Sequence, residues 1–170
     1  PTRRQFDLPR QPRNRDMPKG LEGAKRWESK VTGAMDAGLG TRVFFAHESV
    51  GGGPNLVATV LYLTLHAHRA SRRPLGRKLV VALDNTCGEN KCLCILAMVG
   101  WLVLEFSFDE AMINCMVVGH TFTLLDQSFN TLIDGMRSNV LLTINDMEEE
   151  IFRRMREYNC LEVTELRAVF

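Results

Sequence analysis

Residues 78–91 read KLVVALDNTCGENK, and residues 112–129 read MINCMVVGHTFTLLDQSF. Each stretch opens with an apolar run that predicts a strand. Each closes in a polar cluster that contains an acid, Asp84 in the first and Asp126 in the second. In open α/β sheets, sites are usually built where the carboxyl ends of the strands meet. The two stretches therefore predict two strands of one sheet with a candidate site at their common edge.

Further strands and helices are expected around this pair. Arg42–His47 is short, β-branched and aromatic, which predicts a strand. A helix is expected over residues 54–69, where Pro54 suits the first helical position and leucines line one face. Another is expected over residues 88–104, after the capping-box pattern of Thr86–Glu89. Because this second helix is apolar almost all round, it is expected to be buried against the sheet and a further element.

The end of the chain predicts two more helices, residues 123–136 and residues 146–158, the second capped by Thr143 or Asn145. The alternation of strands and helices favours an α/β fold with a small, mostly parallel sheet flanked by helices. Three strands are few for such a sheet. We therefore expect that the N-terminal strands are missing from this chain or lie hidden in its first 41 residues.

Residues 1–41 are punctuated by proline and glycine, and residues 1–30 hold nine Lys or Arg against four acids. Such a segment buries too little apolar surface to offset the entropy lost on ordering. It is expected to be a basic, largely irregular arm with at most a short helix near residues 22–34. The α/β domain is then residues 42–170.

A second basic segment precedes the 78–83 strand and holds Arg69, Arg72 and Arg73. The net charge of the whole chain is only +1, so the two basic segments are local features of an otherwise acidic body. Together with Lys91, they are candidates for contacts to the backbone of DNA or RNA. A solvated tail and a solvated loop explain the same charges equally well.

Five cysteines, an odd number, lie mostly in or beside apolar runs. This usage predicts reduced, mostly buried thiols in an intracellular protein, nuclear or cytoplasmic. The longest uninterrupted apolar run, residues 92–104, is too short to cross a membrane. No cofactor motif of a small-molecule enzyme is expected, since Gly51–Gly53 lacks the Lys-Ser/Thr pair of a phosphate loop.

Asp84 and Asp126 are the candidate metal ligands. Two carboxylates a few ångströms apart can hold Mg²⁺ or Mn²⁺, which prefer oxygen ligands, and such ions support phosphoryl transfer. His120 lies between them in the sequence and can orient a phosphate or move a proton. A purely structural explanation is also open, because an Asx-turn accounts for Asp84 and a capping box opened by Thr123 accounts for Asp126.

The DN…NK motif of residues 84–91 and the GHT…DQSF motif of residues 119–129 resemble those of a widespread eukaryotic domain family of unknown function. Its members show DN…NK followed by GHTHEDIDxxFS, and they occur in transposon-like open reading frames. Residues 47–55, HESVGGGPN, are similar to the family's upstream turn and helix. The resemblance covers about residues 42–138.

That family is thought to have the ribonuclease-H-like fold of DDE transposases and integrases. The resemblance implies that Arg42–His47 is the third strand, that Asp84 follows the fourth, and that the motif ending in Asp126 follows the fifth. It also implies a mobile-element-derived domain that performs Mg²⁺- or Mn²⁺-dependent phosphoryl transfer on nucleic acid. Asp84, Asp126 and His120 would then be the catalytic residues.

Two departures from the family pattern favour a copy that has lost this chemistry. The second motif has Phe122, Thr123 and Leu124 where the family has a histidine and acids. The strand that carries the first catalytic acid in such folds has no evident counterpart in residues 1–41. The alternative is therefore a non-catalytic domain that binds nucleic acid or protein and retains only the fold.

Overall fold

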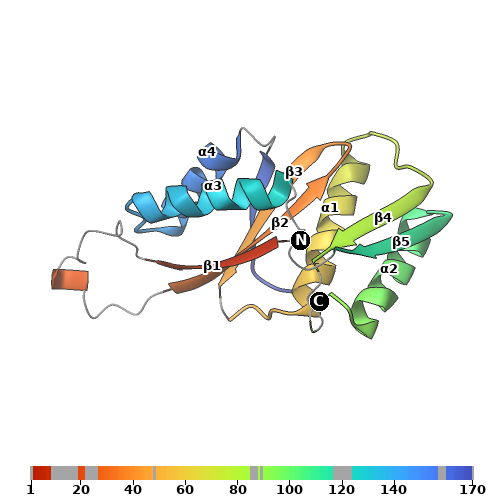
Figure 1. Ribbon diagram of the computed structural model, residues 1–170, viewed down its shortest axis with the longest axis horizontal. Coiled ribbons are helices and arrows are strands. Elements are labelled where there is room, and N and C mark those ends of the chain that lie inside the picture. The colour runs from red at the N-terminus through yellow and green to blue at the C-terminus, as the bar shows by residue number, and fades with distance from the viewer. Residues whose placement is uncertain are drawn as a thin grey trace. The chain divides into compact units, whose positions relative to one another are not determined.

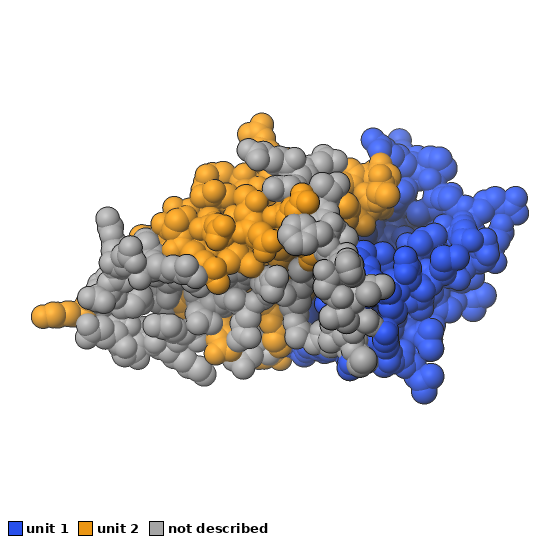
Figure 2. Space-filling view, viewed as in Figure 1, with its two compact units in different colours: residues 1, 50–122, 168–170 blue, residues 2–49, 123–167 orange. Residues whose placement is uncertain are grey.

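A computed structural model describes residues 2–8, 19–21, 27–47, 49–84, 88, 90–116, 124–156 and 160–169. The chain divides into two compact units (Figure 2). Unit 1 comprises residues 50–122 and 168–170 together with residue 1, and unit 2 comprises residues 2–49 and 123–167. Each unit has a hydrophobic core of its own.

Unit 1 is a strand–helix–strand arrangement preceded by a helix (Figure 1). Its elements are α1 (Pro54–Ala70), β4 (Lys78–Leu83), α2 (Leu93–Phe106) and β5 (Glu110–Cys115). β4 and β5 pair in parallel, with Lys78 opposite Glu110 and Leu83 opposite Cys115. All four elements are predicted from the sequence, although α2 begins at Leu93 rather than at Gly88 and β5 begins at Glu110 rather than at Met112.

The core of unit 1 lies between its small sheet and its helices. Leu79, Val81 and Leu83 are the buried residues of β4, and alternate residues of that strand are exposed. From α2, the buried residues Ile95, Val99, Leu102 and Phe106 join the same cluster. The sheet and α1 cover one side of α2, as expected of a helix that is buried against the sheet and a further element, and they leave its other side exposed.

Unit 2 is built on a four-stranded sheet in the order β1-β2-β3-β6. The strands are β1 (Thr2–Leu8), β2 (Trp27–Asp36), β3 (Gly40–His47) and β6 (Cys160–Leu166), and a 3-10 helix, η1 (Lys19–Leu21), lies between the first two in the sequence. β2 pairs antiparallel with β1 and β3, whereas β3 pairs in parallel with β6. The expectation of a mostly parallel sheet is therefore wrong here. The short turn between β2 and β3 can join only antiparallel strands.

The first 41 residues are not a largely irregular arm, because β1 and β2 lie within them. Two strands thus lie hidden in this segment, which is the second of the two alternatives that the sequence left open. The sequence conceals β2 because it contains Gly33 and Ala34, residue types that are depleted in strands. Packing stabilises this strand instead: Val31 is fully buried, and the side chain of Phe129 covers Gly33. A strand also replaces the short helix expected near residues 22–34 in the described part of that segment.

Two helices, α3 (Leu124–Ser138) and α4 (Ile144–Met155), lie side by side and pack against the sheet of unit 2 (Figure 1). Thr143 is the confirmed cap of α4. Its Oγ1 accepts a hydrogen bond from the Asp146 N–H (3.1 Å), and the Asp146 carboxylate accepts one from the Thr143 N–H (2.8 Å). The backbone N–H groups of Thr143 and Leu142 lower the pKa of Asp146.

β6 is missing from the sequence prediction, which ends the ordered elements at residue 158. Its residues, CLEVTEL, include two acids that interrupt the apolar pattern. The parallel pairing places Glu162 opposite Arg42 of β3, and the two side chains form an ion pair. The last strand is therefore stabilised by a contact between residues far apart in the sequence, which its local pattern does not reveal.

Candidate functional site

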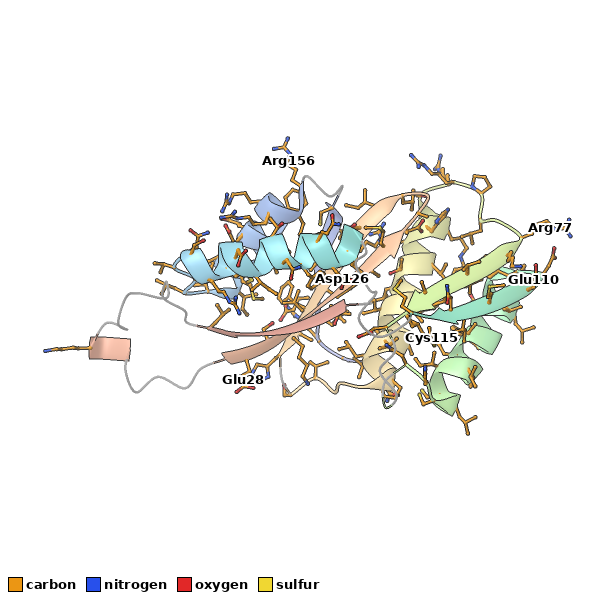
Figure 3. The ribbon with its side chains drawn as sticks, in the orientation of Figure 1. Glu28, Arg77, Glu110, Cys115, Asp126 and Arg156 are labelled. Carbon is orange, nitrogen blue, oxygen red and sulfur yellow. The ribbon has the colours of Figure 1, made fainter. Side chains whose placement is uncertain are left out.

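The carboxyl end of β4 carries Asp84, the first of the predicted site residues. Asp84 follows the strand directly and its side chain is exposed. The parallel pairing continues one step beyond the strands, because the Met116 N–H donates to the Leu83 carbonyl (3.0 Å). β5 therefore ends at the same edge of the sheet, at Cys115, which Figure 3 labels. The prediction that the two strands belong to one sheet and end at the same edge is confirmed.

Both helices of unit 1 begin at this edge. The Cys94 thiol lies 3.6 Å from the Asn55 Oδ1 and joins the first turn of α2 to the first turn of α1. At the other end of the helices, the Arg69 guanidinium lies 3.3 Å from the Glu105 carboxylate. The N-terminus of a helix favours negative charge, since its first N–H groups have no partner within the helix. The edge that holds Asp84 is thus favourable for phosphate groups.

Neither helix start is closed by a side chain. The N-caps, Gly53 for α1 and Cys92 for α2, make no side-chain cap hydrogen bond. Gly53 has φ 71° and ψ −150°, a conformation that side-chain-bearing residues rarely adopt. This explains one glycine of the Gly51–Gly53 run as a requirement of the turn into α1.

Asn90 is a further candidate site residue, which the sequence analysis did not single out. Its side chain is only 6% exposed, and its Nδ2 donates a hydrogen bond to the Asp84 carbonyl (2.8 Å). Asn90 is therefore fixed beside the end of β4. Its buried Oδ1 has no hydrogen-bond partner among the described residues, which is unusual for a buried acceptor. The signal available in the sequence was the asparagine of the DN…NK motif.

Lys91 follows Asn90 and is exposed at the same edge as Asp84. A lysine ammonium at this position can act as a point charge toward a phosphate. The structure therefore brings Asp84 and Lys91 together at one edge, as the sequence predicts. Contact of Lys91 with nucleic acid stays a prediction.

The basic loop between α1 and β4 lies at the opposite edge. β4 is six residues long, so Arg72 and Arg73 are roughly 20 Å from Asp84 along the strand at ~3.3 Å per residue. Both arginines are exposed. Arg69 is engaged elsewhere, since it pairs with Glu105 and its guanidinium lies 4.5 Å from the centre of the Phe106 ring. The structure thus separates these arginines from the Asp84 edge.

Neighbouring cations of this loop are also paired, with acids that lie far ahead in the sequence. The Arg77 Nε lies 2.5 Å from the Asp109 carboxylate, and the Lys78 Nζ lies 3.0 Å from the Glu110 carboxylate. Figure 3 labels Arg77 and Glu110 at the starts of β4 and β5. The local charge of the loop is therefore smaller than its sequence indicates.

The remaining predicted site residues lie in unit 2 or outside the described residues. Asp126 lies half-buried in the first turn of α3 in unit 2, where the helix dipole stabilises an acid (Figure 3). Asp84 belongs to unit 1. His120, and Thr123 of the expected capping box, lie outside the described residues. The pairing of Asp84 with Asp126 stays a prediction.

No thiolate or carboxylate cluster is found in the part of the chain that the structure describes: no group of three or more His, Cys, Asp or Glu is placed to hold a metal ion there. Of the cysteines described, Cys94 is exposed, and Cys92, Cys115 and Cys160 are half-buried. The expectation of mostly buried thiols is therefore wrong. The Asp84 carboxylate is an oxygen donor, the type that Mg²⁺ and Mn²⁺ prefer.

Comparison with known proteins gives one match. No curated protein and no solved structure matches the chain. A family model, described as a domain of unknown function (DUF7869), matches residues 19–170. The match includes the DN…NK motif, both strands of unit 1, and β2, β3 and β6 of unit 2. The chain therefore belongs to the DUF7869 family.

Proposed function

We propose that this protein is a mobile-element-derived, ribonuclease-H-like domain whose ancestral activity is metal-dependent phosphoryl transfer on DNA or RNA. The order of the strands along the chain supports this proposal. With β1 and β2 in place, Gly40–His47 is the third strand, Asp84 follows the fourth, and Glu110–Cys115 is the fifth. These are the positions that the family resemblance implies for them.

The observation that carries the proposal is the setting of Asp84. An exposed carboxylate ends a half-buried strand at the edge where a parallel strand ends and two helices begin. Strand ends of this kind are where α/β folds build their sites. The helix N-termini and Lys91 add positive potential for phosphate groups beside that carboxylate.

Carboxylate oxygens are the donors that a hard cation prefers. Asp84 would supply a carboxylate ligand, Asp126 would supply a second, and Asn90 would hold the Asp84 loop in place through its hydrogen bond to the Asp84 carbonyl. When bound, Mg²⁺ or Mn²⁺ would supply the charge that phosphoryl transfer requires. His120 would orient a phosphate or move a proton.

Replacement of Asp84 with asparagine is expected to abolish a metal-dependent rise in thermal stability. The wild-type melting temperature should rise by several degrees in millimolar Mg²⁺ or Mn²⁺, because a ligand that binds only the folded state stabilises it by mass action. Asn keeps the size of Asp84 but removes the charge that binds the cation. Differential scanning fluorimetry with and without metal measures both effects.

Asp134→Asn is the matched control, because Asp134 is exposed on α3 and belongs to no predicted site. Asp126→Asn tests the second ligand in the same assay. A wild-type protein that gains no stability from either metal would contradict the enzymatic proposal. A metal-dependent rise in melting temperature that remains in Asp84→Asn would show that the metal binds at another site.

The alternative is a non-catalytic binding domain, and the exposed arginines of the basic loop are the observation that favours it. Arg72 and Arg73 lie away from the Asp84 edge, so phosphate binding there needs no catalytic site. Replacing both with alanine is expected to weaken binding to a duplex oligonucleotide. It should also reduce the slope of log K against log salt by about 2, since each lost phosphate contact removes ~0.9.

Fluorescence anisotropy at several salt concentrations checks this expectation. Arg77→Ala serves as the control, because it removes one positive charge from the same loop, at a guanidinium that lies 2.5 Å from the Asp109 carboxylate. Equal slopes for the wild type and the double variant would remove Arg72 and Arg73 from the binding surface. Binding without any metal-dependent stabilisation would favour the non-catalytic alternative.

A further inference from the structure

An exposed apolar stripe runs along the whole of α2. Leu93 and Leu104, at the two ends of the helix, are 83% and 79% exposed, and Leu96 and Trp101 are exposed between them. Ala97 and Gly100 complete the stripe at its centre. We call these six residues the α2 stripe. The opposite face of α2 is buried in the core of unit 1.

Such a stripe is unusual on a protein surface. Single exposed apolar residues are common, whereas contiguous apolar patches mark interaction surfaces. α2 has 14 residues, and no described helix is long and apolar enough to span a membrane. The only charged side chain of α2 is Glu105, which pairs with Arg69 and lies outside the stripe.

The spacing and the order of large and small residues along the α2 stripe are the same when the helix is read from either end. When two copies of α2 lie antiparallel about a two-fold axis near Met98 and Val99, Leu93 of one copy lies opposite Leu104 of the other. Leu96 then lies opposite Trp101, and Ala97 lies opposite Gly100, so that the small residues meet at the centre of the stripe and the large ones meet on either side of it. A two-fold interface requires this self-complementarity, since the same patch serves both partners.

The centre of the stripe also allows close approach. A Cβ atom added at Gly100 would meet nothing within 4 Å, so the helix surface there is open. Helices pack at axial distances of about 8–10 Å, and small residues permit the shorter values. The aromatic row continues from Trp101 to Tyr62 of α1, whose ring centroids are 5.5 Å apart. Aromatic residues are enriched in protein interfaces.

We propose that the α2 stripe is a homodimer interface and that its occupant is the α2 stripe of a second copy of this chain. The absence of charge on the stripe supports a second copy, because two identical chains would otherwise place like charges opposite each other. One 14-residue helix per partner is smaller than a standard interface of ~1,600 Å². The dimer is therefore expected to be weak and concentration-dependent, with Kd on the order of 10 µM.

Sedimentation velocity of the full 170-residue chain between about 1 and 200 µM, a range that brackets this Kd, tests the proposal. The wild type should shift from monomer to dimer across the range. Leu93→Glu and Leu104→Lys should each weaken self-association at least tenfold, since a charge would be buried against a leucine. Both substitutions suit the helix dipole, because the acid lies at the N-terminus and the base at the C-terminus.

The decisive measurement is an equimolar mixture of the two single variants. In the antiparallel pair, the glutamate introduced in one chain faces the lysine introduced in the other, and the remaining leucines face each other. The mixture should therefore recover a dimer that neither variant forms alone. Leu142→Glu is the control, because Leu142 is exposed and apolar but lies outside α2.

A wild type that stays monomeric at 200 µM, the upper end of the range set by the expected Kd, would overturn the proposal. The stripe would then bind something other than a second copy. A dimer that both variants leave intact would place the interface elsewhere. Failure of the mixture to recover the dimer would reject the antiparallel arrangement.

Discussion

Gly33→Ala is expected to destabilise unit 2 by about 2 kcal/mol, because the core has no room for a methyl group at this position. A Cβ at Gly33 would lie 2.9 Å from both the Leu125 Cδ1 and the Phe129 Cζ, well inside the ~3.5–4.0 Å of favourable carbon contacts. Phe129 is fully buried, so its ring cannot swing into solvent. The added methyl therefore forces α3 away from β2.

The effect of the substitution on the entropy of the unfolded chain is stabilising, and it is smaller than the steric cost. Gly33 does not have a positive φ, so alanine is allowed there and gains about 0.4–1 kcal/mol by restricting the unfolded chain. Overpacking costs 1–3 kcal/mol or more and decides the sign. Urea denaturation followed by circular dichroism measures the loss. Gly76→Ala is the control, since its Cβ would meet only ordinary contacts.

A double-mutant cycle separates steric overlap from other causes. Phe129→Leu removes the ring that meets the new methyl, and it should be destabilising alone. Combined with Gly33→Ala, it should cost at least 1 kcal/mol less than the sum of the two single changes, since the residues touch. Additive losses would show that Phe129 is not the obstacle.

Elements with a strong local pattern were predictable from the sequence. α1 has a proline at its start and leucines on one face, and β3, β4 and β5 are apolar runs bounded by turn residues. These features depend on residues close together in the chain. The Thr143 cap was predictable for the same reason, because the capping box spans four residues.

Elements stabilised by distant contacts were not predictable. β2 is ordered by β1 and β3 on its two sides and by Phe129 above Gly33, none of which its own composition reveals. β6 pairs with a strand more than a hundred residues earlier, through Arg42 and Glu162. Tertiary context outweighs strand propensity in both cases.

The candidate site also contains features that a local pattern predicts and features that depend on other contacts. The place of Asp84 follows from the end of an apolar strand, and the parallel strands do end at one edge. The role of Asn90 required a side-chain hydrogen bond that spacing does not show. The pairing of Arg69 with Glu105 joins residues from two helices, so the local charge count of the basic loop overstated its free charge.

Glu150→Gln is expected to lower the unfolding free energy at pH 7 by about 2 kcal/mol, the range of hydrogen bonds to a charged group. Glu150 is buried on α4, and its carboxylate accepts hydrogen bonds from Asn139, Arg153 and Arg154 at 2.7–2.9 Å. Gly135 of α3 makes room for this cluster, since a Cβ there would lie 2.8 Å from the Glu150 Oε1. Glutamine keeps the shape but removes the charge that both arginines bind.

The same variant is expected to change the pH dependence of stability. Burial raises the pKa of Glu150, but the hydrogen bonds from Arg153 and Arg154 outweigh it, so the folded-state pKa is lowered. A lowered pKa means that the stabilisation is complete above the unfolded-state value, near 4.5, and is lost as the pH falls through the folded value. The wild type should therefore lose stability below about pH 4.5 more steeply than Glu150→Gln. Glu149→Gln, on the exposed side of α4, should keep the wild-type slope. Parallel curves for Glu150→Gln and the wild type between pH 3 and 7, the interval that contains the carboxyl titration, would show that the buried carboxylate does not contribute to acid sensitivity.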